Sequence, residues 1–189
     1  MKKLWISVFF LLASLSVFAQ EEHEDHAEEE ELEGDGFHLE EGRYSIAMVL
    51  GHTYIYGAND LDGEEIASYV PMIAIDFNYY VTERLGIGLH TDILFETIFV
   101  EHAGDGEIER DNPIAPALMF GYKLSKHFLL GAGIGAEFAG TETYGLNRIT
   151  LEYGAEIGGG WEFFALLSQD FRWDIYDTTS LGFGIAKRF

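Results

Sequence analysis

Apolar and polar side chains alternate along most of the chain from residue 43 onwards. In one segment Leu85, Ile87 and Leu89 share one side, whereas Gly88 and His90 share the other. A period of two predicts β-strands, because successive side chains of a strand point to opposite faces. Eight such segments can be counted: 43–56, 65–81, 85–100, 114–124, 127–139, 148–157, 161–174 and 180–189.

The breaks between these segments alternate in length. Three are short, at 82–84, 125–126 and 158–160; three are longer, at 57–64, 101–113 and 140–147; and the one at 175–179 is modest. Short turns at one end and longer loops at the other are typical of outer-membrane β-barrels, which also have an even number of strands. The sequence therefore predicts an all-β fold, an eight-stranded antiparallel transmembrane up-and-down β-barrel spanning 43–189.

The two faces of the predicted strands differ in side-chain size as well as polarity. In 127–139, for example, Phe128 and Ile134 oppose Gly131, Gly133 and Glu137. The interior of an eight-stranded barrel is only wide enough for side chains to fill, so we expect the glycine-rich, charged face inside and the apolar face towards lipid. A soluble β-sandwich is the alternative; it would bury the apolar face and leave many glycines in water.

Two segments precede the predicted barrel. Residues 1–19 combine Lys2 and Lys3 with an apolar run and small side chains near Ala19, which predicts a secretory signal peptide. Residues 20–42 carry 12 of the 33 carboxylates and no Lys or Arg, so we expect a disordered acidic tail. The net charge of −22 argues against nucleic acid as a partner.

The C-terminal strand strengthens the membrane interpretation. Phe183, Ile185 and the terminal Phe189 share one face with Leu181. Together with the export signal and eight alternating segments, this ending resembles the small outer-membrane β-barrels of Gram-negative bacteria, of the OmpA transmembrane-domain and OmpX type. The resemblance implies that Phe183, Ile185 and Phe189 form a signal for the barrel-assembly machinery; Lys187 departs from that pattern.

The inward face of the predicted barrel carries charged side chains, with acids outnumbering bases. We interpret them as a network of ion pairs that fills the lumen, because buried charges persist only when they are paired. A cation-selective site or path around His90 is the alternative. The predicted members are Arg43, Asp76, His90, Asp92, Glu96, Lys123, Glu137, Glu152, Glu156, Asp170, Arg172 and Arg188.

The acidic tail also contains three histidines, His23, His26 and His38. Imidazole nitrogens and carboxylate oxygens are ligands for Zn²⁺, Ni²⁺ or Cu²⁺, so weak binding of divalent cations by the tail is one hypothesis. A purely solvating tail is the other. No other cofactor is expected.

The sequence offers no arrangement that predicts catalysis. No histidine is followed two residues later by serine, and the chain has no cysteine, so no activated nucleophile is expected. We therefore predict a non-enzymatic, monomeric outer-membrane protein with a structural, adhesion or ligand-binding role, its tail in the periplasm. Its expected partners are membrane lipids, lipopolysaccharide and, during biogenesis, the assembly machinery. Divalent-cation handling through the tail and lumen is the alternative function.

Overall fold

The computed structural model describes residues 43–59, 65–102, 106–140, 142–173 and 175–189. The predicted signal peptide and acidic tail lie outside these residues. The described part of the chain contains β-strands and no helix long and apolar enough to cross a membrane. The strands are β1 (Tyr44–Asn59), β2 (Glu65–Tyr80), β3 (Leu85–Leu94), β4 (Ile98–His102), β5 (Gly106–Arg110), β6 (Ile114–Lys123), β7 (Phe128–Ala139), β8 (Glu142–Gly158), β9 (Trp161–Arg172) and β10 (Asp177–Arg188).

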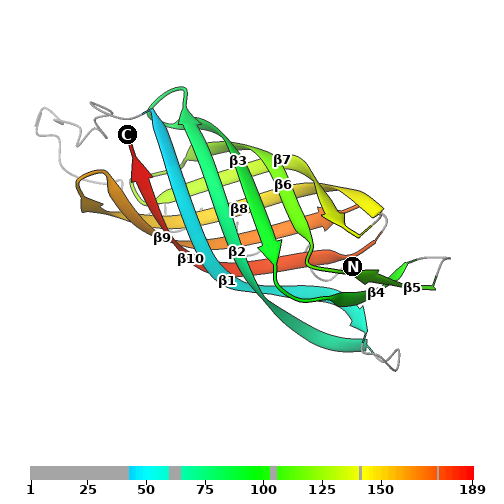
Figure 1. Ribbon diagram of the computed structural model, residues 1–189. Coiled ribbons are helices and arrows are strands. Elements are labelled where there is room, and N and C mark those ends of the chain that lie inside the picture. The colour runs from blue at the N-terminus through cyan, green and yellow to red at the C-terminus, as the bar shows by residue number, and fades with distance from the viewer. Residues whose placement is uncertain (1–42, 60–64, 103–105, 141, 174) are drawn as a thin grey trace, which may run out of the picture. The chain divides into compact units, whose positions relative to one another are not determined.

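Eight of these strands form a closed antiparallel barrel (Figure 1). Its order is β1, β2, β3, β6, β7, β8, β9 and β10, each paired with its neighbour. β10 also pairs with β1, from Ser45 opposite Arg188 to Ile55 opposite Thr178, and this pairing closes the sheet. The predicted eight-stranded up-and-down barrel is confirmed.

The remaining two strands correct the predicted course of 85–100. This segment was expected to be one strand, but β3 ends at Leu94, whose amide donates to the Pro113 carbonyl oxygen. Residues 98–102 instead pair with residues 106–110 as the β4–β5 hairpin. The predicted loop at 101–113 therefore contains half of a hairpin, which lies at the opposite end of the barrel from the C-terminus (Figure 1).

Other boundaries also differ from the prediction. The break expected at 140–147 is mostly strand, because β8 begins at Glu142 and pairs with β7 from there. β1 continues to Asn59 beyond a register shift between Ile55 and Ala58, where Gly57 has a φ of 71°. Polar residues marked these stretches as breaks, but inter-strand hydrogen bonds satisfy their backbone groups as well as those of apolar residues.

The barrel wall is apolar on its outside. Large hydrophobic side chains are exposed on every barrel strand, among them Leu50, Phe77, Leu89, Phe120 and Ile134. The inward side chains are small or polar, as expected from the alternation. An exposed apolar surface of this extent is stable only in an apolar surrounding, which identifies the wall of a transmembrane barrel.

Candidate functional site in the barrel lumen

A buried carboxylate, Glu137 on β7, lies at the centre of the upper lumen, towards the long connections between strands. Arg110 donates to its Oε1 from Nε at 3.1 Å and from Nη2 at 2.9 Å. Arg172 donates from Nε to Oε2, and the Tyr176 hydroxyl lies 2.8 and 2.7 Å from the two oxygens. Burial raises the pKa of Tyr176, which keeps its hydroxyl protonated as a donor.

A second cluster lies next to this one, around Arg148 on β8. Its Nε and Nη2 donate to the two oxygens of Asp170, both at 2.7 Å, and its Nη1 donates to Asp92 at 2.9 Å. Arg172 Nη2 lies 3.5 Å from Asp170 Oδ2 and so links the two clusters. We call Arg110, Arg148, Arg172, Asp92, Glu137 and Asp170 the arginine network.

The arginine network is balanced in charge. It joins three guanidinium groups to three carboxylates, and all six side chains are buried. Bidentate and charge-assisted hydrogen bonds of this kind are the arrangement that makes a buried ion pair tolerable. Because an eight-stranded barrel has little interior room to begin with, these side chains fill the cross-section of the upper lumen.

The β4–β5 hairpin closes the upper end of the barrel further. β4 pairs with β1 at Ala58 and Asn59, whereas Arg110 of β5 donates to the carbonyl oxygens of Ala139 and Glu142 at 3.0 and 3.3 Å. β1 and β7 are four positions apart in a ring of eight strands, so the hairpin reaches from one side of the mouth to the other. Ile98 and Val100 of β4 are buried in the adjoining apolar cluster.

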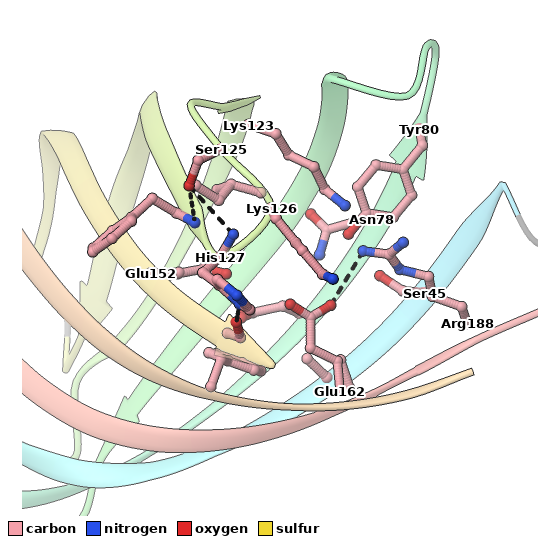
Figure 2. A pocket seen from close by; sticks show the side chains of 17 residues that line it. Ser45, Asn78, Tyr80, Lys123, Ser125, Lys126, His127, Glu152, Glu162 and Arg188 are labelled. Carbon is pink, nitrogen blue, oxygen red and sulfur yellow. Dashed lines mark hydrogen bonds and ion pairs between the residues drawn. The ribbon is translucent and has the colours of Figure 1, made fainter. Parts of the chain in front are cut away.

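The lower lumen contains a polar cavity next to the 124–127 turn (Figure 2). The Tyr80 ring lies there between two cations, with the Arg188 guanidinium carbon 4.7 Å and the Lys123 Nζ 5.4 Å from its centre. Arg188 also pairs with Glu162 at 3.1 Å. The cavity measures about 30 Å³, enough for roughly two water molecules.

Two buried polar atoms of the lower lumen, one on a residue that lines this cavity and one on a residue that lines a small cavity just above it, lack a partner among the described residues. Asp76 Oδ1 and Thr150 Oγ1 accept or donate no hydrogen bond among the described residues. His90 is partnered: its Nε2 lies 2.9 Å from Asn78 Oδ1, and its Nδ1 lies 3.8 Å from Asp76 Oδ2. The lower lumen is thus less completely satisfied than the arginine network above it.

The predicted lumen residues divide into three groups. Asp92, Glu137, Asp170 and Arg172 belong to the arginine network. Around the lower cavity and just above it lie Asp76, His90, Lys123, Glu152 and Arg188. The remaining predicted members, Arg43, Glu96 and Glu156, are exposed.

Each exposed member has a structural reason. Arg43 precedes β1, and its carbonyl oxygen accepts from the Tyr80 amide while its side chain remains outside the lumen. Glu96 follows the end of β3, so the inward parity of that strand no longer applies to it. Glu156 lies near the end of β8, where its side chain is 60% exposed although it approaches Arg188 to 3.9 Å. The predicted lumen positions of Arg43, Glu96 and Glu156 are therefore wrong, because all three side chains are exposed. Glu156 nevertheless approaches a lumen side chain, Arg188.

The sequence prediction also missed three members of the site. Arg148 shares the inward face of its strand with Glu152, so the alternation does place it inside, but it was not included among the expected members. Arg110 and Tyr176 lay in predicted loops, where alternation gives no signal. With Arg110 and Arg148 included, the expected surplus of acids in the upper lumen disappears.

The other predicted sites have different outcomes. Phe183, Ile185 and Phe189 lie on the outer face at the C-terminal strand, and the Phe189 amide donates to the Tyr44 carbonyl oxygen at 3.0 Å. Their recognition by the assembly machinery stays a prediction. His23, His26 and His38 lie outside the described residues, within which no three His, Asp or Glu side chains are arranged to hold a metal ion.

Comparison with known proteins identifies the fold rather than a family. No family model matches the chain, and no curated protein matches it in sequence. The solved structure of Neisserial surface protein A matches with a TM-score of 0.54 and 11% identity, over 77% of this chain and 97% of that one. The attachment invasion locus protein Ail of Yersinia pestis matches with a TM-score of 0.52 and 12% identity, over 79% and 99%. The chain has the fold of the small outer-membrane β-barrels.

Proposed function

We propose that the protein is a non-conducting outer-membrane anchor that binds cationic partners at its long-connection end. The observation that carries the proposal is the closed upper lumen, filled by the arginine network and spanned by the β4–β5 hairpin. A barrel without an aqueous path cannot conduct solutes, so its function depends on what its surface binds. The long connections would face the cell exterior and the short turns the periplasm, as in outer-membrane barrels generally.

Charge supports a cationic partner. The short turns carry Glu83, Arg84 and Lys126, one acid and two bases. The long connections and the β4–β5 hairpin carry ten acids and a single base, Arg110, whose side chain is buried inside the barrel. The acids are Asp60, Asp62, Glu64, Glu96, Glu101, Asp105, Glu107, Glu109, Asp111 and Asp174. Connections of predominantly one charge sign attract groups of opposite charge and raise their rate of encounter.

The strand arrangement supports an extended partner. β5 pairs with β4 on one side and is the last strand of the sheet on the other, within the described part of the chain. An edge strand offers unpaired amide and carbonyl groups to which an extended polypeptide can add as a further strand. One structural neighbour is named an attachment invasion locus protein, which agrees with an adhesive role at this end.

A binding experiment tests the proposal. Refolded protein in phosphatidylcholine vesicles should bind a fluorescent lysine-rich peptide, and the affinity should fall as salt is raised. Replacing the exposed Glu96 and Glu109 by lysine should weaken binding by about tenfold, because two attractions become repulsions. Glu83→Lys, an exposed reversal at the short-turn end, is the control and should leave binding unchanged. Absence of binding, or equal loss in the control, would overturn the proposal.

A further inference from the structure

The lower lumen contains two adjoining polar cavities. The first lies beside the 124–127 turn, and Ser125 and His127 of that turn line it (Figure 2). The second lies just above it, and Asn78 and Glu152 line both. Each measures about 30 Å³, which is room for about two water molecules. Water or a small ion therefore fits these cavities, whereas an organic molecule is too large.

One carboxylate oxygen at the first cavity has no hydrogen-bond partner. Asp76 lines this cavity and is only 3% exposed, and its Oδ1 accepts no hydrogen bond within the described residues. The other oxygen, Oδ2, lies 3.8 Å from His90 Nδ1, which is longer than a hydrogen bond. A buried oxygen requires a partner, because leaving it unpaired costs free energy. The partner of Asp76 Oδ1 is therefore a species that fits the cavity.

The charges around the first cavity include one surplus acid. Three acids and two bases that are buried or partly buried line it: Asp76, Glu152, Glu162, Lys123 and Arg188. Two exposed residues add one charge of each sign, because Lys126 lines the cavity from the turn and Glu156 approaches Arg188 to 3.9 Å. With neutral imidazoles on His90 and His127, the surroundings carry one more negative charge than positive charge.

The surplus charge distinguishes between the possible occupants. A water molecule would satisfy Asp76 Oδ1 but would leave the buried charge uncompensated, whereas a cation does both. Carboxylate, amide and water oxygens are the ligands that hard cations prefer. One surplus charge favours a monovalent cation over a divalent one. In agreement, no three His, Asp or Glu side chains of the described residues are arranged to hold a metal ion.

We propose that the first cavity is a binding site for one monovalent metal cation. Asp76 Oδ1 coordinates the ion, the charge of Glu152 adds to its attraction, and water molecules complete its coordination. The ion enters from the short-turn end, because the arginine network fills the lumen above. The site is thus a closed end and not a path across the membrane. This inference is independent of the partner proposed for the long connections.

Unfolding in two salts of equal ionic strength tests the site. Full-length protein is refolded into phosphatidylcholine vesicles and unfolded with urea in sodium chloride or in choline chloride. Choline is too large for the cavity, so only sodium can stabilise the folded protein by binding there. At about 0.2 M salt, a site with a dissociation constant of about 0.1 M should make the unfolding equilibrium constant about threefold lower in sodium than in choline.

Two variants assign the salt effect to Asp76. Asp76→Asn removes the surplus negative charge and should abolish the difference between the two salts. Glu83→Gln is the control, because it removes an exposed acid at the same end of the barrel, and the threefold difference should remain. Heat-modifiable migration on a gel verifies that each variant has formed its barrel. If Asp76→Asn does not fold, Glu152→Gln removes the surplus charge instead and gives the same comparison.

Three results would overturn the proposal. The first is equal unfolding of the wild-type protein in the two salts, which is expected if water or a protonated His90 satisfies Asp76. The second is an undiminished difference between the salts in Asp76→Asn. The third is loss of the difference in Glu83→Gln, which would assign the effect to ions at the surface.

Discussion

The upper and lower halves of the lumen are built from the same residue types but satisfy them differently. Above, Glu137 and Arg148 have every charged group engaged by an opposite charge. Below, Asp76 keeps one carboxylate oxygen without a partner in the described part of the chain, next to a cavity large enough for water. The upper half is closed by paired charges, whereas the lower half contains a small polar cavity beneath them.

This comparison shows which contacts close the lumen of the barrel. Charge alone does not close a lumen, because both halves contain acids and bases. Closure requires bidentate hydrogen bonds between guanidinium groups and carboxylates, and Arg148 forms such bonds with Asp170. Removing a charged side chain should therefore lower the unfolding free energy strongly in the upper lumen and only slightly in the lower lumen.

The largest effect is expected at Glu137. Glu137→Ala leaves Arg110 and Arg172 buried without their shared carboxylate, and loss of one partner of a buried ion pair costs about 3–5 kcal/mol of unfolding free energy. Urea unfolding in lipid vesicles, followed by tryptophan fluorescence, measures it. Glu109→Ala, at an exposed site on β5, is the control and should change the free energy by less than about 0.5 kcal/mol. Comparable stability of the two variants would contradict the distinction.

An intermediate effect is expected from packing of the wall. A Cβ on Gly133 would clash with the Leu118 carbonyl oxygen and the Met119 sulfur, so Gly133→Ala should cost about 1–3 kcal/mol. Gly121 lines the small cavity just above the lower one, and the atom nearest to a Cβ there would be Leu129 Cδ2, at 3.4 Å. Gly121→Ala should therefore be close to neutral in the same unfolding assay. If both substitutions cost equally, the lower lumen is as tightly packed as the upper.

The smallest effect is expected at Asp76. Asp76→Asn replaces a buried carboxyl group whose Oδ1 has no hydrogen-bond partner among the described residues, so the unfolding free energy should change by less than about 1 kcal/mol. Asp170→Asn is the matched substitution in the arginine network and should cost several times more, because Arg148 loses its bidentate partner. Equal losses would show that the two halves are equivalent.

Alternation along the chain was sufficient to predict the barrel and its inner and outer faces. It succeeded because every barrel strand has lipid on one side and a crowded lumen on the other, as Leu89 and His90 illustrate. It failed after Leu94, where the chain leaves the wall: the parity that placed Glu96 inside ends with β3. Arg110 could not be found this way, since its contacts depend on a hairpin that crosses the barrel mouth. The pairing of Arg148 with Asp92 likewise depends on which strands face each other across the lumen.

Single-channel recording in planar lipid bilayers tests the closure of the lumen most directly. The wild-type protein should give a baseline without conductance steps. The triple variant Asp92→Ala, Arg148→Ala and Asp170→Ala removes one whole cluster and leaves Arg110 and Arg172 paired with Glu137, and it should give discrete steps through the vacated space. Steps of the same size from the wild-type protein would contradict the account.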